Sequence, residues 1–202
     1  AAPDTVNPSL WRQAQIMQHF TGLFEVTEGI YQVRGLDISN ITFIEAPEGV
    51  VVMDPLVSAE TAKAGLDLYR KHRGDKPVVA VIFSHSHIDH YGGVKGVISQ
   101  EDIDSGKVKI YAPEGFTEAA LNENVIGGNR QTRLSGYQYS QLVEPGPTGS
   151  VTSGLGLINS RGTITFAVPT NVISEPFQKE TIAGLDFEFM LAPDTEAPAE
   201  MF

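Results

Sequence analysis

The sequence contains no cysteine among its 202 residues. Disulfide bonds, thiolate metal sites and cysteine nucleophiles are therefore excluded, so any metal must be held by nitrogen and oxygen atoms. The absence of cysteine does not fix the cellular compartment. Basic residues are also scarce, because 14 Lys and Arg stand against 25 Asp and Glu, for a formal net charge of −11. A field of this sign repels nucleic acids and acidic membranes, so we expect no nucleic-acid partner, and an anionic substrate would need local positive charge.

Long apolar runs are missing as well. No stretch reaches the ~18 apolar residues that a membrane helix needs, so no membrane span is predicted. The first four residues have neither the basic nor the apolar stretch of a signal peptide, and there is no starting Met. The hydrophobic fraction of 41% is nevertheless enough for a sizeable core. With no repeat and no linker, residues 1–202 are interpreted as one domain.

The apolar patterns predict an α/β fold with mixed sheets. Strands are expected at 29–34, 41–46, 50–54, 77–83 and 109–112, with a hairpin at 182–190. Helices are expected at 9–17, at 58–73 and, broken by Gly127-Gly128, at 113–139. The Gly-, Ser- and Pro-rich segment 145–156 is predicted to be a loop. The first three strands should form an antiparallel start to the sheet.

A dense cluster of metal-binding side chains follows the buried strand at 77–83. Three of the five histidines lie within six positions, as His85, His87 and His90, together with Asp89. In an extended run, the first two histidines and the aspartate share a period of two and face the same side. A turn after Ile88 would direct Asp89 and His90 to a second metal. This density disfavours an ordinary polar loop and predicts a two-metal hydrolase site.

Residues around the cluster fit this interpretation. Two metals ~3.5–4 Å apart can share a hydroxide and bring its pKa toward neutrality. Gly92 and Gly93 offer small residues where the backbone must pass close to the metals. His19 and His72 lie in or near helices and are expected to have no part in the site.

The pattern His85-x-His87-x-Asp89-His90, with Gly92-Gly93 behind it, resembles the signature of the metallo-β-lactamase superfamily. The resemblance implies an αββα sandwich with mixed sheets, of which this chain would form a part. It also implies two Zn²⁺ ions held by the four clustered side chains, with Asp89 orienting the metal-bound water.

Asp54 ends the strand that begins at Val50, and it resembles the aspartate of the superfamily's first motif. We expect Asp54 to support the site from outside the ligand set.

A narrower resemblance covers nearly the whole chain. Segments 7–13, 31–35, 37–40, 90–96 and 195–201 look like those of zinc-dependent alkyl sulfatases. This implies a sulfuric ester hydrolase that converts a small-molecule alkyl sulfate into an alcohol and inorganic sulfate through a metal-bound water or hydroxide. It also implies a homodimer formed through regions outside this chain, and it favours a periplasmic or secreted location. Some of four polar residues on the predicted broken helix could contact the sulfate: Asn124, Asn129, Arg130 and Arg133. For each of them, a position on a solvent-exposed helix face is as well supported by the sequence.

The ligand set is incomplete within the sequence, because no histidine follows His90. Alkyl sulfatases add two glutamates and a later histidine, and the stretch 196–200 resembles the place of the first glutamate. We favour Glu196 over Glu200 as that ligand and expect the remaining ligands beyond Phe202. The chain is then the N-terminal portion of a catalytic domain.

Two alternatives to an alkyl sulfatase stay open. One is another hydrolase of the superfamily, acting on a β-lactam, a thioester or a phosphodiester, whose later ligands would be rich in histidine. The other is a metal-binding fragment without catalysis. Metal analysis combined with activity assays separates these possibilities.

Overall fold

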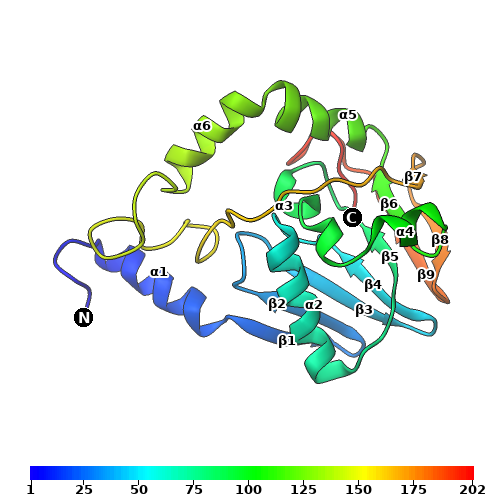
Figure 1. Cartoon of the computed structure of the whole chain (residues 1–202), viewed down its shortest axis with the longest axis horizontal. Coiled ribbons are helices and arrows are strands. Elements are labelled where there is room, and N and C mark those ends of the chain that lie inside the picture. Colours follow the sequence, from blue (N-terminus) through cyan, green and yellow to red (C-terminus); the bar gives the residue numbers. More distant parts are fainter.

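A computed structural model describes all 202 residues and is built around one seven-stranded sheet, in the order β1 to β7 (Figure 1). The strands are β1 (Gly22–Thr27), β2 (Ile30–Arg34), β3 (Ile41–Ala46), β4 (Gly49–Met53), β5 (Val78–Ile82), β6 (Lys109–Pro113) and β7 (Asn171–Ile173). Pairing is antiparallel from β1 to β4 and parallel from β4 to β7. The predicted mixed sheet with an antiparallel start is therefore confirmed.

Helices lie mainly on one face of this sheet, where α2 crosses the strands (Figure 1). They are α1 (Pro8–His19), α2 (Ala59–Arg73), α3 (Ile88–Tyr91), α4 (Gln100–Asp104), α5 (Phe116–Leu121) and α6 (Gly128–Gln138), with the 3-10 turn η1 (Val94–Gly96) and the π-helical turn η2 (Asn122–Ile126). Helix α2 begins at the N-cap Ser58, whose side chain accepts a hydrogen bond from the Thr61 amide. It buries Ala62, Leu66 and Tyr69, the face that the helical spacing predicts.

The opposite face of the sheet is covered by a separate hairpin, β8 (Gln178–Ile182) and β9 (Leu185–Phe189). The apolar cluster between these layers consists of Val51, Ala80, Ile82, Tyr111, Ile173, Ile182, Phe189 and Met201. The result is a helix layer, a central sheet and the start of a second sheet, which agrees with the expected sandwich architecture.

The sequence patterns missed two strands at the edges. The first three residues of β1 are half-buried and the last three are exposed. A strand without a regularly buried face needs no alternation of apolar and polar residues, which is the pattern that predicts strands. β7 has only three residues and is held by parallel pairing with β6. Between α6 and β7, residues 139–170 form a long segment without strands or helices, which includes the predicted loop (Figure 1).

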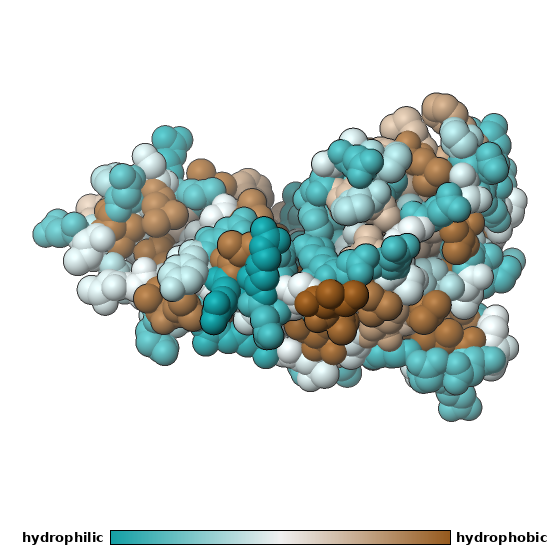
Figure 2. Space-filling view, turned by 90° about the horizontal axis from the view of Figure 1, so that it is seen from above, coloured by the Kyte–Doolittle hydropathy of each residue, from teal (hydrophilic) through white to brown (hydrophobic).

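The predicted broken helix at 113–139 is a separate arm that passes over the sheet edge. It consists of α5, η2 and α6, and it is interrupted at Gly127, within the predicted Gly127-Gly128 break (Figure 1). Val125 and Ile126 are 70% and 80% exposed, and apolar surface shows as a brown patch when the molecule is seen from above (Figure 2). No helix of the chain combines the length and apolarity required to cross a membrane.

Candidate metal centre

The clustered residues sit where two parallel strands end. Met53 of β4 is paired with Ile82 of β5, so Asp54, the next residue, lies beside Ser84, two residues beyond Ile82. Asp54 has φ +55, a left-handed conformation that aspartate tolerates better than most residues, and its amide donates to the Ile82 carbonyl at 3.0 Å. Carboxyl ends of parallel strands are the usual place for ligand sites in such sheets.

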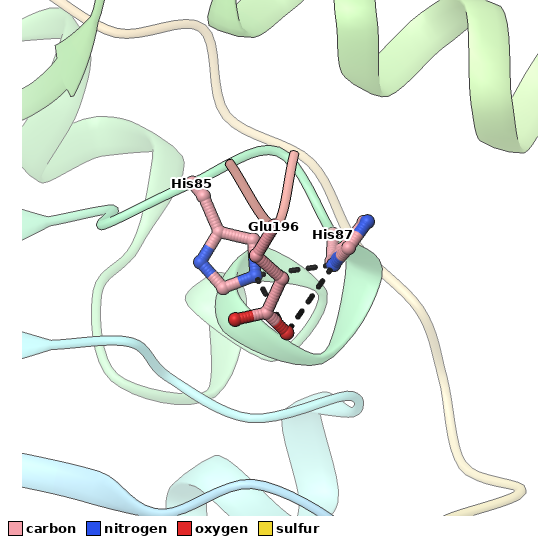
Figure 3. Close-up of side chains that lie close together, drawn as sticks. All are labelled: His85, His87 and Glu196. Atoms are coloured by element: carbon pink, nitrogen blue, oxygen red, sulfur yellow. Dashed lines mark hydrogen bonds and ion pairs between the residues drawn. The ribbon is translucent and has the colours of Figure 1, made fainter. Parts of the chain in front are cut away.

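A first group of three donor atoms comes from His85, His87 and Glu196, whose side chains point toward one another (Figure 3). His85 Nε2 lies 3.2 Å from His87 Nδ1 and 4.0 Å from Glu196 Oε1. His87 Nδ1 lies 3.9 Å from the same glutamate oxygen. Ligands of a tetrahedral Zn²⁺ with ~2.0–2.2 Å bonds are about 3.4 Å apart, so the donor set fits one such ion after small shifts.

A second pair of donors adjoins the first. The chain turns into α3 at Ile88, and His90 Nε2 then lies 3.3 Å from Asp89 Oδ2. The rings of His85 and His90 have centroids 4.0 Å apart, so the two donor groups share a border. The structure thus brings together all four clustered residues and Glu196, whose nitrogen and carboxylate donors are of the types that zinc accepts.

Asp54 connects to both groups through hydrogen bonds. Its Oδ1 accepts from the Ser84 amide at 2.8 Å, and its Oδ2 accepts from the Ser84 hydroxyl at 2.7 Å. The same Oδ2 lies 2.9 Å from His90 Nδ1, and Ser84 Oγ lies 3.0 Å from His85 Nδ1. The contacts place Asp54 one hydrogen bond from His90 and, through Ser84, two from His85. A residue that orients ligands would make such contacts, and that role stays a prediction.

The hydrogen bonds assign the tautomer of His85 and the ring orientation of His90. Ser84 has a single hydroxyl hydrogen, and it goes to Asp54. His85 Nδ1 must therefore donate to the Ser84 oxygen, which leaves His85 Nε2 with a free lone pair. His90 Nδ1 donates to Asp54, so His90 Nε2 is directed at Asp89. In both rings the Nε2 atom faces the candidate metal positions.

The electrostatics of the site favour a positive charge on His90 and disfavour one on His85. Burial, and then the charges of His90 and His87, lower the pKa of His85. Burial opposes protonation of His90 too, but its hydrogen bonds to Asp54 and Asp89 prevail and raise its pKa to about 10. For Asp89, burial is outweighed by the contacts with His90, and its pKa is lowered. A cation is thus held between two carboxylates, and His90 Nε2 must lose its proton before it can coordinate a metal.

The two glutamates of the terminal stretch have different contacts. Glu200 is 6% exposed, and its Oε2 accepts from the Thr195 hydroxyl at 2.6 Å and from the amides of Glu196 and Ala197 at 2.8 and 3.2 Å. Glu200 also forms a β-bridge with His85 through the backbone. The Glu196 side chain is 65% exposed and faces the histidines. Glu200 therefore holds the turn, and Glu196 offers the free carboxylate.

The two glycines after the cluster pack tightly against the loop after β4. A Cβ on Gly93 would lie 2.0 Å from the Pro55 carbonyl oxygen, and one on Gly92 would lie 2.2 Å from that of Val57. The backbone at these glycines passes close to residues 55–58, in the loop after β4. Their small size is therefore required by this contact, and the expected approach to the metals stays a prediction.

The other predicted residues lie outside the two donor groups. His19 and His72 are exposed, as expected. Asn124 donates to the Ala120 carbonyl at 3.1 Å within its own helical segment. Arg130 lines a pocket of about 600 Å³ together with His87, Gly115, Glu118, Ala119, Asn122, Glu123, Pro198 and Ala199. The exposed Asn129 and Arg133 do not line that pocket.

Sequence comparison gives this geometry a context. Residues 34–189 match the metallo-beta-lactamase superfamily, a range that holds the whole cluster from His85 to His90. The chain belongs to the metallo-β-lactamase superfamily. The superfamily match ends before Glu196, so the terminal glutamates need a narrower comparison.

More specific relatives match nearly the full length of the chain. It is 56% identical to a linear primary-alkylsulfatase of Pseudomonas sp., over 100% of this chain and 30% of the relative. It is 51% identical to the alkyl/aryl-sulfatase BDS1 of Saccharomyces cerevisiae, over 98% of the chain and 30% of that relative. The chain thus spans about 30% of the length of these curated relatives.

A solved structure has the same backbone fold. The stereoselective inverting sec-alkylsulfatase Pisa1 of Pseudomonas sp. superposes with a TM-score of 0.93 at 48% identity, over 99% of this chain and 32% of that one. This superfamily chain therefore has the backbone of an alkylsulfatase segment over nearly all of its residues.

Proposed function

We propose that the protein that includes this chain hydrolyses alkyl sulfate esters to an alcohol and inorganic sulfate, with two zinc ions. The observation that carries this is the full-length similarity to alkylsulfatases combined with two adjoining groups of nitrogen and carboxylate donors. Because these relatives are alkylsulfatases, the similarity favours a sulfate ester over a β-lactam, thioester or phosphodiester.

Each donor group would hold one ion. His85 Nε2, His87 Nδ1 and Glu196 Oε1 would bind the first, and Asp89 and His90 would bind the second with further ligands. Bound zinc would supply a Lewis acid and a water of lowered pKa. Asp89, at the border of the two groups, would also orient that water. Asp54 keeps Nε2 of His85 and of His90 turned toward the ions through their Nδ1 atoms.

The substrate's sulfate needs local positive charge, because the chain as a whole carries −11. Arg130 is the one cation among the residues that line the pocket beside His87. We infer that it attracts the sulfate group toward the metal centre, with a guanidinium geometry suited to a multi-oxygen anion. Glu118 and Glu123 line the same pocket, and Gln131 donates to Glu123 at 2.7 Å, which spreads part of that glutamate's charge.

The test is to measure zinc content and sulfate release in the intact protein, with a medium-chain primary alkyl sulfate as substrate and a chromogenic β-lactam as contrast. We expect two zinc ions per protein and turnover of the alkyl sulfate only. Turnover of the β-lactam alone, or zinc binding without any hydrolysis, would contradict the proposal.

Two matched substitutions test the ligand assignment. Glu196→Gln should lose zinc and reduce sulfate release by orders of magnitude, because it removes the charged ligand itself. Glu200→Gln should cost only ~10–100-fold, as is typical for a residue that orients a ligand. The reverse order of effects would show that Glu200 is the ligand.

A further inference from the structure

A buried polar loop between β2 and β3 lies against the metal centre without belonging to it. Its residues Asp37 and Ser39 are 1% and 8% exposed. Burying a carboxylate and a hydroxyl costs free energy unless hydrogen bonds replace those with water. Their partners therefore indicate what the loop does.

Ser39 reaches across 50 residues of sequence to the metal centre. Its hydroxyl donates to the backbone carbonyl of Asp89 at 2.6 Å. In a longer helix that carbonyl would accept from the amide four residues on, that of Gly93. Helix α3 ends at Tyr91, however, and the Gly93 amide donates instead to the Leu56 carbonyl at 2.9 Å. Ser39 thus supplies a donor to a carbonyl at the end of a one-turn helix.

Asp37 fixes the loop that carries Ser39. Its Oδ1 accepts from the amides of Ile38 and Ser160, both at 3.0 Å. Its Oδ2 accepts from the Val57 amide at 3.2 Å and from the Thr61 hydroxyl at 2.9 Å. One carboxylate therefore ties its own loop to the segment after β4, to the first turn of α2 and to the irregular segment before β7.

We propose that Ser39 is a positioning residue for Asp89 and that Asp37 anchors the loop from which it acts. The hydrogen bond to the Asp89 carbonyl sets the height and rotation of the first turn of α3. The same turn carries the Asp89 carboxylate and His90, so a shift of its backbone moves both donors of the second group. This inference rests on the proposed function, in which those two side chains hold the second ion.

The experiment compares Ser39→Ala and Ser39→Thr in the intact protein. Without the hydroxyl, we expect kcat to fall ~10–100-fold with KM within about twofold, the size of effect seen when a group that orients a metal ligand is lost. Zinc retained after dialysis against a chelator should fall from two ions toward one. Ser39→Thr keeps the hydroxyl donor and should restore both kcat and zinc content.

A matched control removes a hydroxyl elsewhere. The Tyr69 hydroxyl donates to Glu45 at 3.0 Å, beside Arg73 at the far end of α2 from the site. Tyr69→Phe should lower the melting temperature comparably and leave kcat and zinc content unchanged. Equal losses of zinc in Tyr69→Phe and Ser39→Ala would show a general stability effect and overturn the proposal.

Other outcomes separate this inference from the proposed function. Wild-type kcat and zinc retention in Ser39→Ala would refute the positioning role alone. A folded Ser39→Thr variant that fails to regain zinc would refute it as well. If the wild type binds two zinc ions but hydrolyses no alkyl sulfate, the substrate assignment fails, and zinc retention still decides the role of Ser39. If the wild type binds no zinc, both proposals fail.

Discussion

Replacing Asp54 by asparagine should test the orientation of the metal centre more sharply than any ligand deletion. The carboxylate has three hydrogen-bond donors around it, and two of them, the Ser84 hydroxyl and His90 Nδ1, converge on Oδ2. An amide that keeps its oxygen on the Ser84 amide places an NH₂ group against those two donors. The Ser84 hydroxyl must then turn its hydrogen to His85 Nδ1, which moves the ring proton of His85 to Nε2, the atom that faces the first metal position.

The magnitude follows from these contacts. Groups that orient metal ligands typically contribute ~10–100-fold in metal affinity or activity. Since Asp54 controls His85 through Ser84 and His90 directly, we expect the upper end, about 100-fold in kcat/KM, or about 2.7 kcal/mol of transition-state stabilisation. The cost to folding should be smaller, ~1–3 kcal/mol, for hydrogen bonds that lose a charged partner.

The assay is zinc content after dialysis, sulfate release and thermal unfolding of Asp54→Asn in the intact protein. The control is Asp102→Asn, because the Asp102 carboxylate accepts a serine hydroxyl, that of Ser99, at the same distance of 2.7 Å in the capping box of α4. The control should keep full activity. Wild-type zinc content and rate in Asp54→Asn would refute the tautomer argument and leave Asp54 as a simple strand end.

Three further predictions concern the ligands, the close backbone contact and acid stability. His85→Ala and Asp89→Ala should each lose zinc at one position and reduce hydrolysis by orders of magnitude, and normal metal content with a normal rate would exclude the assignment. Gly93→Ala should destabilise by ~3 kcal/mol or more, because the new methyl meets a carbonyl oxygen at 2.0 Å, whereas Gly128→Ala, with nothing within 4 Å, should be neutral or stabilising in a melting experiment. The pKa of Glu45 is lowered to about 2 by Arg73, against the effect of burial, with Lys76 and Tyr69 contributing. This folded-state pKa lies below the ordinary value of 4.5, so Glu45 stabilises the fold above about pH 4.5 and loses that effect as the pH falls toward 2. Glu45→Gln should therefore lower the free energy of unfolding by about 1–3 kcal/mol at pH 7. It should also make that free energy depend less on pH in the acid range.

The candidate site was predictable where it is local in sequence. Four donors lie within six residues after a buried strand, and their types limit the chemistry to a nitrogen- and oxygen-ligated metal. The central strands were predictable for a similar reason, since each is a short apolar run between turns. The edge strands β1 and β7 were not, because edge positions and pairing partners decide their structure more than their own patterns do.

The contacts that support the site could not be predicted from the sequence, because they join segments that are distant along the chain. Ser84 precedes the cluster directly, yet only the parallel pairing of β4 and β5 places Asp54 beside it. Ser39 and Asp89 are separated by 50 residues. The tight glycines also need a partner to be interpreted, since the loop that Gly92 and Gly93 contact starts 37 residues earlier, at Pro55. A single sequence carries no record of such pairs.

The number of hydrogen bonds that each carboxylate accepts separates those that would orient this centre from those that would bind a cation. Asp37, Asp54 and Glu200 are each less than 9% exposed, and each accepts three or four hydrogen bonds from amides, hydroxyls or an imidazole. Those bonds offset the desolvation cost of a buried charge. They engage both oxygens of Asp37 and of Asp54, whereas the three bonds of Glu200 all go to Oε2.

Asp89 and Glu196 show the opposite pattern. Their nearest polar partners at the centre are imidazole nitrogens at 3.3 Å and 3.9–4.0 Å, atoms that would themselves turn toward a cation. Sequence alone ranks an aspartate at a strand end, a buried loop aspartate and two neighbouring glutamates as similar candidates. The hydrogen bonds that each carboxylate already accepts distinguish them. Asp37, Asp54 and Glu200 are each held by three or four, whereas Asp89 and Glu196 face imidazole nitrogens and would be the two available to a cation.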